Sequence, residues 1–402
     1  MPLLKRDLTM EQQLARAPLD LPFLTLVVLL TTIGVIAVFS ASYATAVHEN
    51  HAATYYFIRQ AIFAVGGVAA MYVISRVNYQ QLRWMSVFVL GAALILLVLV
   101  LIPGFHTVRN DGVRRWIRGI GPIPAFQPSE VAKLGVILYF AARMSKRETE
   151  KKRSFDTKTL QGRLLRFADN IGLLELLPYG VILGIIMILM KQEPHMSGMI
   201  LILAGAAAIL FAGGVSWGWI ISGGVVVIGA IILMISGSGY QSGRIAIWRD
   251  PWSDPGDKGF QIIQSLYAVG SGGLFGVGFG KSRQAQLFLP EAENDFIFSV
   301  WCEEMGLVGA VIVLLLFVML ILRGYWIALH ARDKFGALLV VGIITLMAVQ
   351  VFLNISVVTN FLPTTGISLP FFSYGGTALM IQLAEMGIVL GVSRQVAPPK
   401  QG

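Results

Sequence analysis

Long apolar runs separated by short polar breaks are the dominant pattern of this chain. The runs are roughly 20 residues long, which is the length that a helix needs to cross the hydrocarbon core of a bilayer. No stretch between them is large enough for a sizeable soluble domain. The pattern predicts an all-α polytopic membrane protein with about ten transmembrane helices. The runs begin near Leu21, Tyr55, Leu82, Pro128, Ile171, Ser197, Val215, Phe298, Phe335 and Ser373.

Composition supports the membrane class. Hydrophobic residues make up 56% of the chain and charged residues 13%. The single cysteine, Cys302, lies in an apolar run, which excludes intrachain disulfides and cysteine-rich metal sites. A small-residue sequence, Ala44-Thr45-Ala46, follows the first run and resembles a signal-peptidase site. That run is too long for an ordinary signal peptide, so we predict a retained first helix.

The basic residues predict how the chain is oriented, because short cytoplasmic loops are enriched in Lys and Arg. They place both termini in the cytoplasm, with a cytoplasmic N-terminal tail (1–20), a transmembrane domain (21–393) and a cytoplasmic C-terminal tail (394–402). A long extracytoplasmic loop (237–297) joins predicted helices seven and eight. The cations on the cytoplasmic side include a block at 143–166 together with Lys5, Arg6, Arg16, Arg76, Arg83, Arg323, Arg332, Lys334, Arg394 and Lys400.

Two of the predicted outer loops are basic, against this preference. Arg114 and Arg115 lie in the first loop, and Lys281 and Arg283 lie in the long one. Cations clustered beside the bilayer suit an anionic ligand such as a phosphate or diphosphate. Attraction to membrane lipid headgroups or to nearby acidic residues is an equally weighted alternative. The 143–166 block is interpreted as an orientation signal, so no nucleic-acid partner is predicted.

Ionisable residues within the spans are costly and therefore need partners or a function. Glu130 and Lys133 stand three residues apart in QPSEVAKL and share one helix face, where they could form an ion pair or line a cavity. Arg59, at the start of the second span, could add a cation to the same outer cavity.

A break in KQEPHMSGM follows the fifth span. Pro194 ends the helix and Ser197 can cap the next one. His195 could be a ligand or a base, although a lone histidine in a turn is more often a surface residue. A second irregular run, GSGGLFGVGFGKS, has glycine spacing that is only weakly indicative of nucleotide binding because no βαβ unit surrounds it. A flexible or re-entrant loop is the favoured interpretation there.

Asp295 lies in LPEAENDFIFSV, where the long polar loop turns into a membrane helix. A carboxylate at such a boundary is a candidate catalytic group. The structural alternative is a helix N-cap, a position that aspartate favours.

Four separated motifs resemble those of the SEDS (shape, elongation, division and sporulation) family. They are RRWIRGIGPIPAFQPSEVAKL, KQEPHMSGM, GFQIIQSLYAVGSGGLFGVGFGKSRQ with LPEAENDFIFSV, and NISVVTNFLPTTGISLPFFSYGG. The segment SVVTNFLPTTG is more similar to the division-type FtsW or sporulation-type SpoVE pattern than to the elongation-type RodA pattern. One departure is KQEPHMSGM, which has His195 in place of the usual aspartate motif, with Glu193 nearby as a partial substitute.

The resemblance implies a peptidoglycan glycosyltransferase that polymerises lipid II at the outer face of the cytoplasmic membrane for septal cell-wall synthesis. It implies Asp295 as the general base and a class B penicillin-binding protein, with other divisome proteins, as partners. No dedicated metal site is expected, although Mg²⁺ or Mn²⁺ could be held with the substrate diphosphate. A lipid II flippase and an elongation-type polymerase are the alternatives. The candidate substrate-binding residues are Arg59, Arg114, Arg115, Glu130, Lys133, His195, Ser197, Lys281, Arg283 and Ser373.

Overall fold

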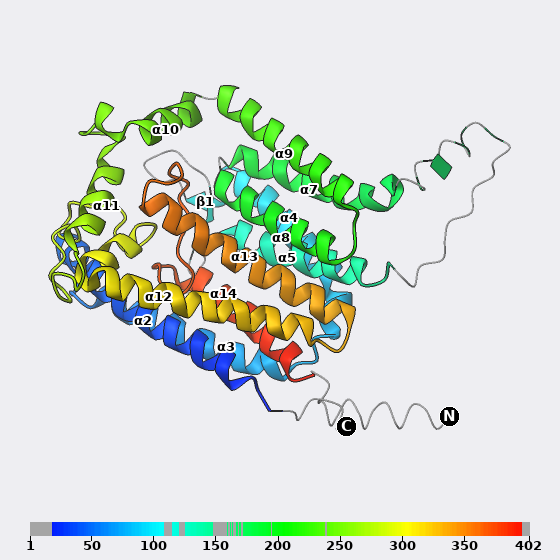
Figure 1. The fold of residues 1–402 in the computed structure, drawn as a ribbon, viewed down its shortest axis with the longest axis horizontal. Helices are drawn as coiled ribbons and strands as arrows, with labels where there is room; N and C mark the ends of the chain where they lie inside the picture. The colour runs from blue at the N-terminus through cyan, green and yellow to red at the C-terminus, as the bar shows by residue number, and fades with distance from the viewer. Residues whose placement is uncertain are drawn as a thin grey trace.

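The computed structural model describes residues 18–107, 115–119, 125–147, 172–193, 195–237 and 239–395, with isolated positions between 159 and 169. The chain is built almost wholly of helices (Figure 1). They are α2 (Leu21–His48), α3 (Tyr55–Arg76), α4 (Gln81–Leu101), α5 (Pro128–Met144), α7 (Leu173–Gln192), α8 (Met196–Ala212), α9 (Trp217–Gly237), α10 (Gly239–Arg249), α11 (Phe260–Ser271), α12 (Ile297–Leu329), α13 (Lys334–Val358) and α14 (Gly376–Ser393), with a short 3₁₀ helix at Pro251–Ser253.

Seven of the described helices, α2, α3, α4, α7, α12, α13 and α14, are long and apolar enough to cross a membrane. The predicted class of multi-pass membrane protein is therefore confirmed. Three further helices, α5, α8 and α9, begin close to the other predicted runs. Their described apolar parts are shorter or carry charge, so the count of ten spans stays a prediction, as do the domain boundaries.

A two-stranded antiparallel sheet is one departure from the all-α prediction. Strands β1 (His106–Thr107) and β2 (Trp116–Ile117) pair in the connection between α4 and α5, and Ile117 forms a further bridge with Phe126. Two-residue strands give no detectable alternation in the sequence. The sheet matters because it leads directly to Arg115 on one side and to Gln127 on the other.

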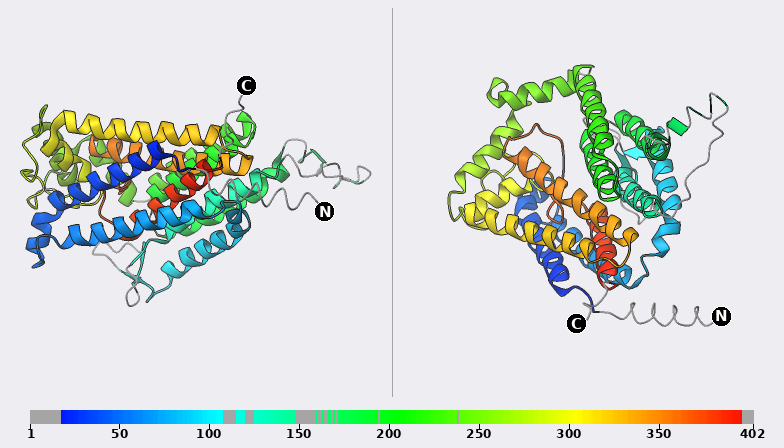
Figure 2. Two further views of the ribbon diagram at one scale, coloured as in Figure 1. Left: turned by 90° about the horizontal axis from the view of Figure 1, so that it is seen from below. Right: turned by 45° about the vertical axis from the view of Figure 1, so that its right-hand side comes forward.

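The helices pack in pairs, of which two are antiparallel and one, α3 with α14, is parallel because both helices begin at one cavity and end at another. Helix α3 lies against α14, α4 against α5, and α12 against α13. The segment 237–297 lies at one end of this bundle and carries α10 and α11 rather than open loop (Figure 1). Figure 2 shows the same bundle from below and turned by 45°. We call the two ends of the bundle the 237–297 end and the opposite end.

The glycine-rich run noted in the sequence wraps around a break in α12. Gly306 has φ 65° and ψ −167° within that helix, and a Cβ there would lie 2.6 Å from the Leu274 carbonyl oxygen. Adjacent carboxylates of α12 then bind the loop: Glu303 accepts from the Arg283 backbone N–H at 3.0 Å and Glu304 from that of Gly280 at 3.1 Å. Backbone hydrogen bonds therefore anchor the run to α12, while Leu274, Phe275 and Phe279 within it stay exposed.

Candidate functional site

A cavity of about 560 Å³ opens at the 237–297 end, where segments distant in the sequence converge. Its wall includes the start of α3, the strand β2, the start of α5, the turn before α8, the segment before α12 and the segment before α14. Five of the residues predicted from the sequence line it: Arg59, Arg115, Glu130, His195 and Asp295. The expected shared cavity of Arg59 and Glu130 is therefore present, and Arg115, His195 and Asp295 also line it.

Asp295 is held by a buried amide on a neighbouring helix. The Asn354 side chain, on α13, is fully buried and donates from Nδ2 to the backbone carbonyl of Asp295 at 2.8 Å and to that of Ile367 at 2.7 Å. One amide therefore ties the segment before α12 to the segment before α14. The contact leaves the Asp295 side chain on the cavity wall, because only its backbone is used.

We expect Asn354→Leu to lower the apparent melting temperature and to reduce activity at least tenfold. The change keeps the volume but leaves two buried carbonyl groups without their donor, at about 1–3 kcal/mol each. Melting curves in detergent and polymerisation of labelled lipid II would check this. Thr359→Val is the matched control, since the Thr359 hydroxyl bonds only the backbone of its own helix. Wild-type activity in Asn354→Leu would contradict the positioning role.

The segment before α14 has no regular structure, and buried amides satisfy its backbone. Gln60 donates to the Ser373 carbonyl at 3.1 Å, and Gln350 donates to that of Ser368 at 2.9 Å. Gln382 accepts from the Phe371 N–H at 3.1 Å. Irregular backbone at membrane depth needs such partners because hydrocarbon offers none. These contacts fix the cavity wall formed by this segment.

Gly366 lies where an acid and a cation approach the same point of that wall. A Cβ on this residue would lie 3.4 Å from Asp295 Oδ2 and 4.0 Å from Arg115 Nη1. Its φ of +69° also favours glycine. The carboxylate and the guanidinium thus face one space, which suits a ligand that carries both a proton to be removed and a negative charge. A second carboxylate, Glu291, lines the cavity and accepts from Asn294 Nδ2 at 2.6 Å.

Glu130 and Lys133 form the ion pair that their spacing predicted. Lys133 Nζ lies 2.7 Å from Glu130 Oε2, and the two side chains are 3% and 12% exposed. Glu130 lines the cavity, whereas Lys133 lies behind it. The two alternatives weighed from the sequence therefore both hold, with Glu130 as a lining residue and Lys133 as its buried counterion.

Arg59 stands over an aromatic ring at the cavity wall. Its guanidinium carbon lies 4.6 Å from the centre of the Tyr55 ring. Tyr374, from the segment before α14, also lines the cavity and packs edge-on against Tyr56, with ring centres 4.9 Å apart. The Tyr55 ring restricts the long arginine side chain and so helps to place its charge at the cavity wall.

The turn before α8 places two ionisable residues in apolar surroundings. Burial raises the pKa of Glu193 to about 8, with the Arg115 charge opposing the shift, so its carboxyl group is mostly protonated at neutral pH. Burial, aided by Arg115 and Lys133, lowers the pKa of His195 to about 3, so the imidazole is neutral. The His195 ring nitrogens lie 3.3 and 3.4 Å from Gln127 Nε2.

His195 and Glu193 differ in whether their side chains reach the cavity. His195 is buried and lines the cavity, which contradicts the surface interpretation of a lone histidine. Glu193 is absent from the cavity lining and presents its backbone carbonyl to Arg115 Nε at 3.3 Å. Among the described residues, neither carboxyl oxygen of Glu193 has a hydrogen-bond partner. A buried, mostly neutral Glu193 is therefore a poor substitute for an ionised aspartate.

Glu193→Gln is expected to make the protein more resistant to alkaline pH. Because the folded-state pKa is raised from 4.5 to about 8, the wild type loses stability relative to the variant as pH rises across that interval. We expect the melting temperatures to differ little at pH 5 and to diverge by about 5 °C at pH 9. Glu175→Gln, at a partly exposed ion pair, is the control. A difference in melting temperature between wild type and Glu193→Gln that does not grow with pH would refute the raised pKa of Glu193.

Among the described residues, four further predicted ones do not line the cavity: Ser197, Lys281, Arg283 and Ser373. Ser197 is buried within α8, and Ser373 is structural, accepting from the Leu369 N–H at 2.7 Å and donating to the Asn294 carbonyl at 2.8 Å. Lys281 and Arg283 lie on the loop bound by Glu303 and Glu304, away from the lining. Their positive charge had suggested ligand binding, but their position follows from the anchoring of the loop to Glu303 and Glu304. Arg114 lies outside the described residues.

The side chains at the cavity bear on whether the protein itself could hold a metal ion. In the described part of the chain, no group of three or more His, Cys, Asp or Glu side chains is placed to hold a metal ion. Asp295 and Glu291 supply carboxylates to the cavity, and such oxygens suit Mg²⁺ or Mn²⁺. An ion held jointly with the substrate diphosphate stays a prediction.

Comparison with known proteins gives one consistent result. The family model described as "Cell cycle protein", FtsW/RodA/SpoVE, matches residues 21–397. A probable peptidoglycan glycosyltransferase FtsW from Geobacter metallireducens is 42% identical over 94% of this chain and 95% of that protein. Stage V sporulation protein E from Bacillus subtilis is 39% identical over 93% and 97%. A chain of a peptidoglycan synthase complex that coordinates polymerisation and crosslinking has a TM-score of 0.70 at 27% identity, covering 96% and 99%. The chain therefore belongs to the FtsW/RodA/SpoVE, or SEDS, family.

Proposed function

We propose that this protein is a peptidoglycan glycosyltransferase that polymerises lipid II into β-1,4-linked glycan strands for the division septum. Family membership and relatives named FtsW and SpoVE support the activity and the division-type assignment over the elongation type. The observation that carries the proposal is the cavity itself. Asp295 shares it with Arg59 and Arg115 at one end of a membrane bundle.

Asp295 acts as the general base in this proposal. Its carboxylate takes the proton of the acceptor 4-hydroxyl as that oxygen attacks the anomeric carbon of the donor. The bond from this carbon to the lipid diphosphate breaks, and the electron pair leaves with the diphosphate. Attack opposite the leaving group converts an α-linked donor into a β-linked product. General-base catalysis of this kind contributes about 10²–10⁴ in rate.

Arg59 and Arg115 are proposed to bind the diphosphate. Guanidinium groups bind phosphate oxygens in a bidentate manner, and the negative charge on the leaving group grows as the bond breaks. The neutral His195, next to Gln127, adds a hydrogen-bonding group without adding charge. Glu130, neutralised in part by Lys133, is placed to orient a sugar hydroxyl.

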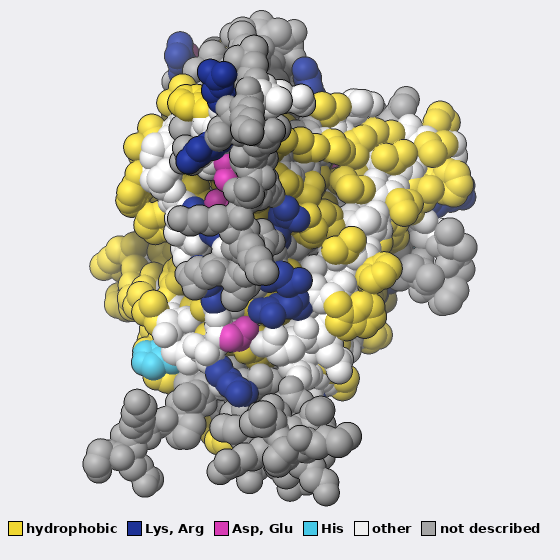
Figure 3. All heavy atoms as spheres, turned by 90° about the vertical axis from the view of Figure 1, so that its right-hand side faces the viewer, with side chains coloured by type: hydrophobic (Ala, Val, Ile, Leu, Met, Phe, Trp, Pro, Cys, Tyr) yellow, Lys and Arg dark blue, Asp and Glu magenta, His cyan; other side chains and the backbone are white. Residues whose placement is uncertain are grey.

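The 237–297 end is proposed to face the outside of the cell, with both termini in the cytoplasm. Basic loops at the opposite end support this orientation. Figure 3 looks onto that opposite end, where Lys and Arg side chains gather across the middle and hydrophobic side chains cover the flanks. The cavity would then meet lipid II at the outer leaflet.

A class B penicillin-binding protein is the proposed partner. The similar chain of known structure comes from a complex that joins polymerisation to crosslinking. Crosslinking needs a transpeptidase, and the apolar runs of this chain leave no room for such a domain.

The direct test is polymerisation of labelled lipid II by the purified protein with its cognate class B partner, read as glycan strands on a gel. Strands from the wild-type pair support the proposal. A flippase would instead move labelled lipid II across vesicle membranes and make no strands. That result, from well-folded protein with its partner bound, would overturn the glycosyltransferase assignment.

A further inference from the structure

A second cavity, of about 600 Å³, lies at the opposite end of the bundle. The turn between α3 and α4, the turn between α12 and α13, and the end of α14 form its wall. The two ends of α3 show how far the second cavity is from the first. Arg59 lines the first cavity and Arg76 the second, and the intervening helix spans about 25 Å. The second cavity therefore plays no part in the chemistry at Asp295.

Four arginines line this second cavity together with one carboxylate. They are Arg76, Arg83, Arg332 and Arg394, and the carboxylate is Asp333. Arg394 is only 5% exposed, although it is charged. Burying a guanidinium beside other cations is unfavourable unless an anion compensates the charge.

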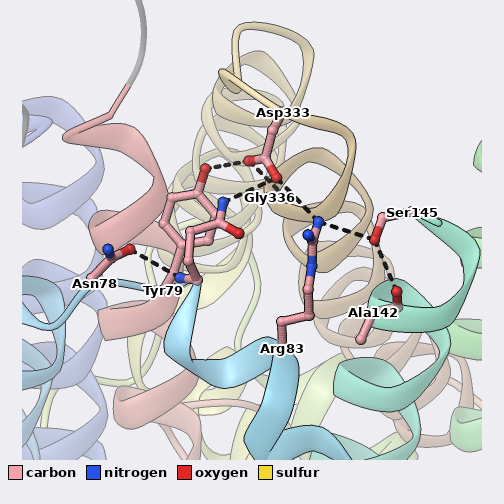
Figure 4. A network of polar contacts seen from close by, with 8 residues as sticks. Asn78, Tyr79, Arg83, Ala142, Ser145, Asp333 and Gly336 are labelled. Atoms are coloured by element: carbon pink, nitrogen blue, oxygen red, sulfur yellow. Dashed lines mark hydrogen bonds and ion pairs between the residues drawn. The ribbon is translucent and has the colours of Figure 1, made fainter. Parts of the chain in front are cut away.

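Asp333 is already engaged by its neighbours and cannot compensate all four cations. It accepts from the Tyr79 hydroxyl, from Gln80 Nε2 at 3.0 Å and from the Gly336 N–H at 3.4 Å (Figure 4). Arg83 reaches toward it at 3.6 Å and donates to Ser145 Oγ at 3.2 Å. This network fixes Arg83 between the end of α5 and the start of α13, and it already occupies both oxygens of the Asp333 carboxylate.

The helix ends at the cavity do not supply the missing negative charge. The carboxyl ends of α3 and α14 each contribute about half a negative charge, and Arg394 donates to the Ser75 carbonyl at 3.4 Å. The amino ends of α4 and α13 lie at the same place and contribute opposite charges of similar size. Four guanidinium groups and one carboxylate therefore leave a net charge of about +3.

The preference for basic cytoplasmic loops explains the sign of these charges but not their arrangement. That preference is satisfied by side chains extended into water. Here the arginines surround one concave space whose volume is within the range of small-molecule sites. Asn78, Gln80 and Gln395 add amide groups to the same wall.

We propose that this arginine cavity binds a phosphate-bearing anion at the membrane surface. Guanidinium groups match phosphate oxygens in geometry and charge, and four of them suit a group with two or more negative charges. The phosphate could belong to the headgroup of an anionic phospholipid or to a free diphosphate. Binding would join the α3–α4 turn, the α12–α13 turn and the end of α14.

Two measurements on the full-length protein test the proposal and separate the sources. Sodium pyrophosphate is titrated into protein in neutral detergent, against sodium chloride of equal ionic strength, with binding followed by calorimetry. Protein in nanodiscs of mixed phosphatidylglycerol and phosphatidylcholine is then released and examined by native mass spectrometry for retained lipid. The test variant is Arg76→Gln with Arg332→Gln, since both residues are exposed, and Arg143→Gln is the control at the same end.

We expect the double variant to weaken pyrophosphate binding, or to lower phosphatidylglycerol retention, about tenfold while Arg143→Gln matches the wild type. Retention of phosphatidylglycerol would identify a headgroup site, and pyrophosphate binding without lipid retention a soluble ligand. If pyrophosphate binds at the Asp295 cavity instead, the double variant will bind it as tightly as the wild type does, which counts against the proposal. An unchanged double variant, or no response above chloride and phosphatidylcholine, would overturn the proposal.

Discussion

Asp295→Asn is expected to lower the rate of lipid II polymerisation by about 10²–10⁴. The amide has nearly the shape of the carboxylate but cannot take the proton of the acceptor hydroxyl. The fold should tolerate the change, because Asn354 binds the backbone carbonyl of Asp295 and not its side chain. Glycan strands from labelled lipid II, measured with the class B partner present, would give the rate.

Asp257→Asn is the matched control for this change. Asp257 is an exposed aspartate in the same 237–297 segment, outside the Asp295 cavity lining. It removes the same charge from the same end of the protein, so it reports any general electrostatic effect on the anionic substrate. Equal losses in both variants would mean that charge, rather than proton transfer, explains the result. Full activity in Asp295→Asn would refute the assignment of the base.

The sequence predicted the helices well because apolar length is a local property. Predicted runs beginning near Leu21, Tyr55 and Phe335 match helices beginning at Leu21, Tyr55 and Lys334. Asp295 and the Glu130–Lys133 pair could also be singled out, since a carboxylate at a membrane boundary and charges on one helix face are unusual. Family motifs then supplied the chemistry of the site.

Positioning residues could not be predicted because they act across the fold. Asn354 is an uncharged residue within an apolar run, yet its side chain joins Asp295 to Ile367 through two backbone contacts. Lys281 and Arg283 lie in a predicted outer loop that Glu303 and Glu304 anchor to α12, and neither basic residue lines the cavity. Charge in the sequence therefore did not by itself show which side chains reach the cavity, since Arg59 and Arg115 line it and Lys281 and Arg283 do not.

Lys133→Met is expected to destabilise the protein by about 3–5 kcal/mol, because it leaves the Glu130 carboxylate without its buried counterion. The apparent melting temperature in detergent should fall by on the order of 10 °C. Glu175→Gln breaks the Arg147–Glu175 pair, whose side chains are 32% and 35% exposed. That control should cost less than about 1 kcal/mol, because water solvates the charge that remains.

The double variant Glu130→Gln with Lys133→Met separates stability from function. Removing both charges leaves no uncompensated buried ion, so most of the melting temperature should return. Polymerisation should remain low, because the cavity has lost the Glu130 carboxylate, which lines it and is proposed to orient a sugar hydroxyl. Restored activity along with restored stability would show that the pair is purely structural. A double variant as unstable as Lys133→Met would instead show that packing of the lysine stem, rather than charge compensation, stabilises this part of the bundle.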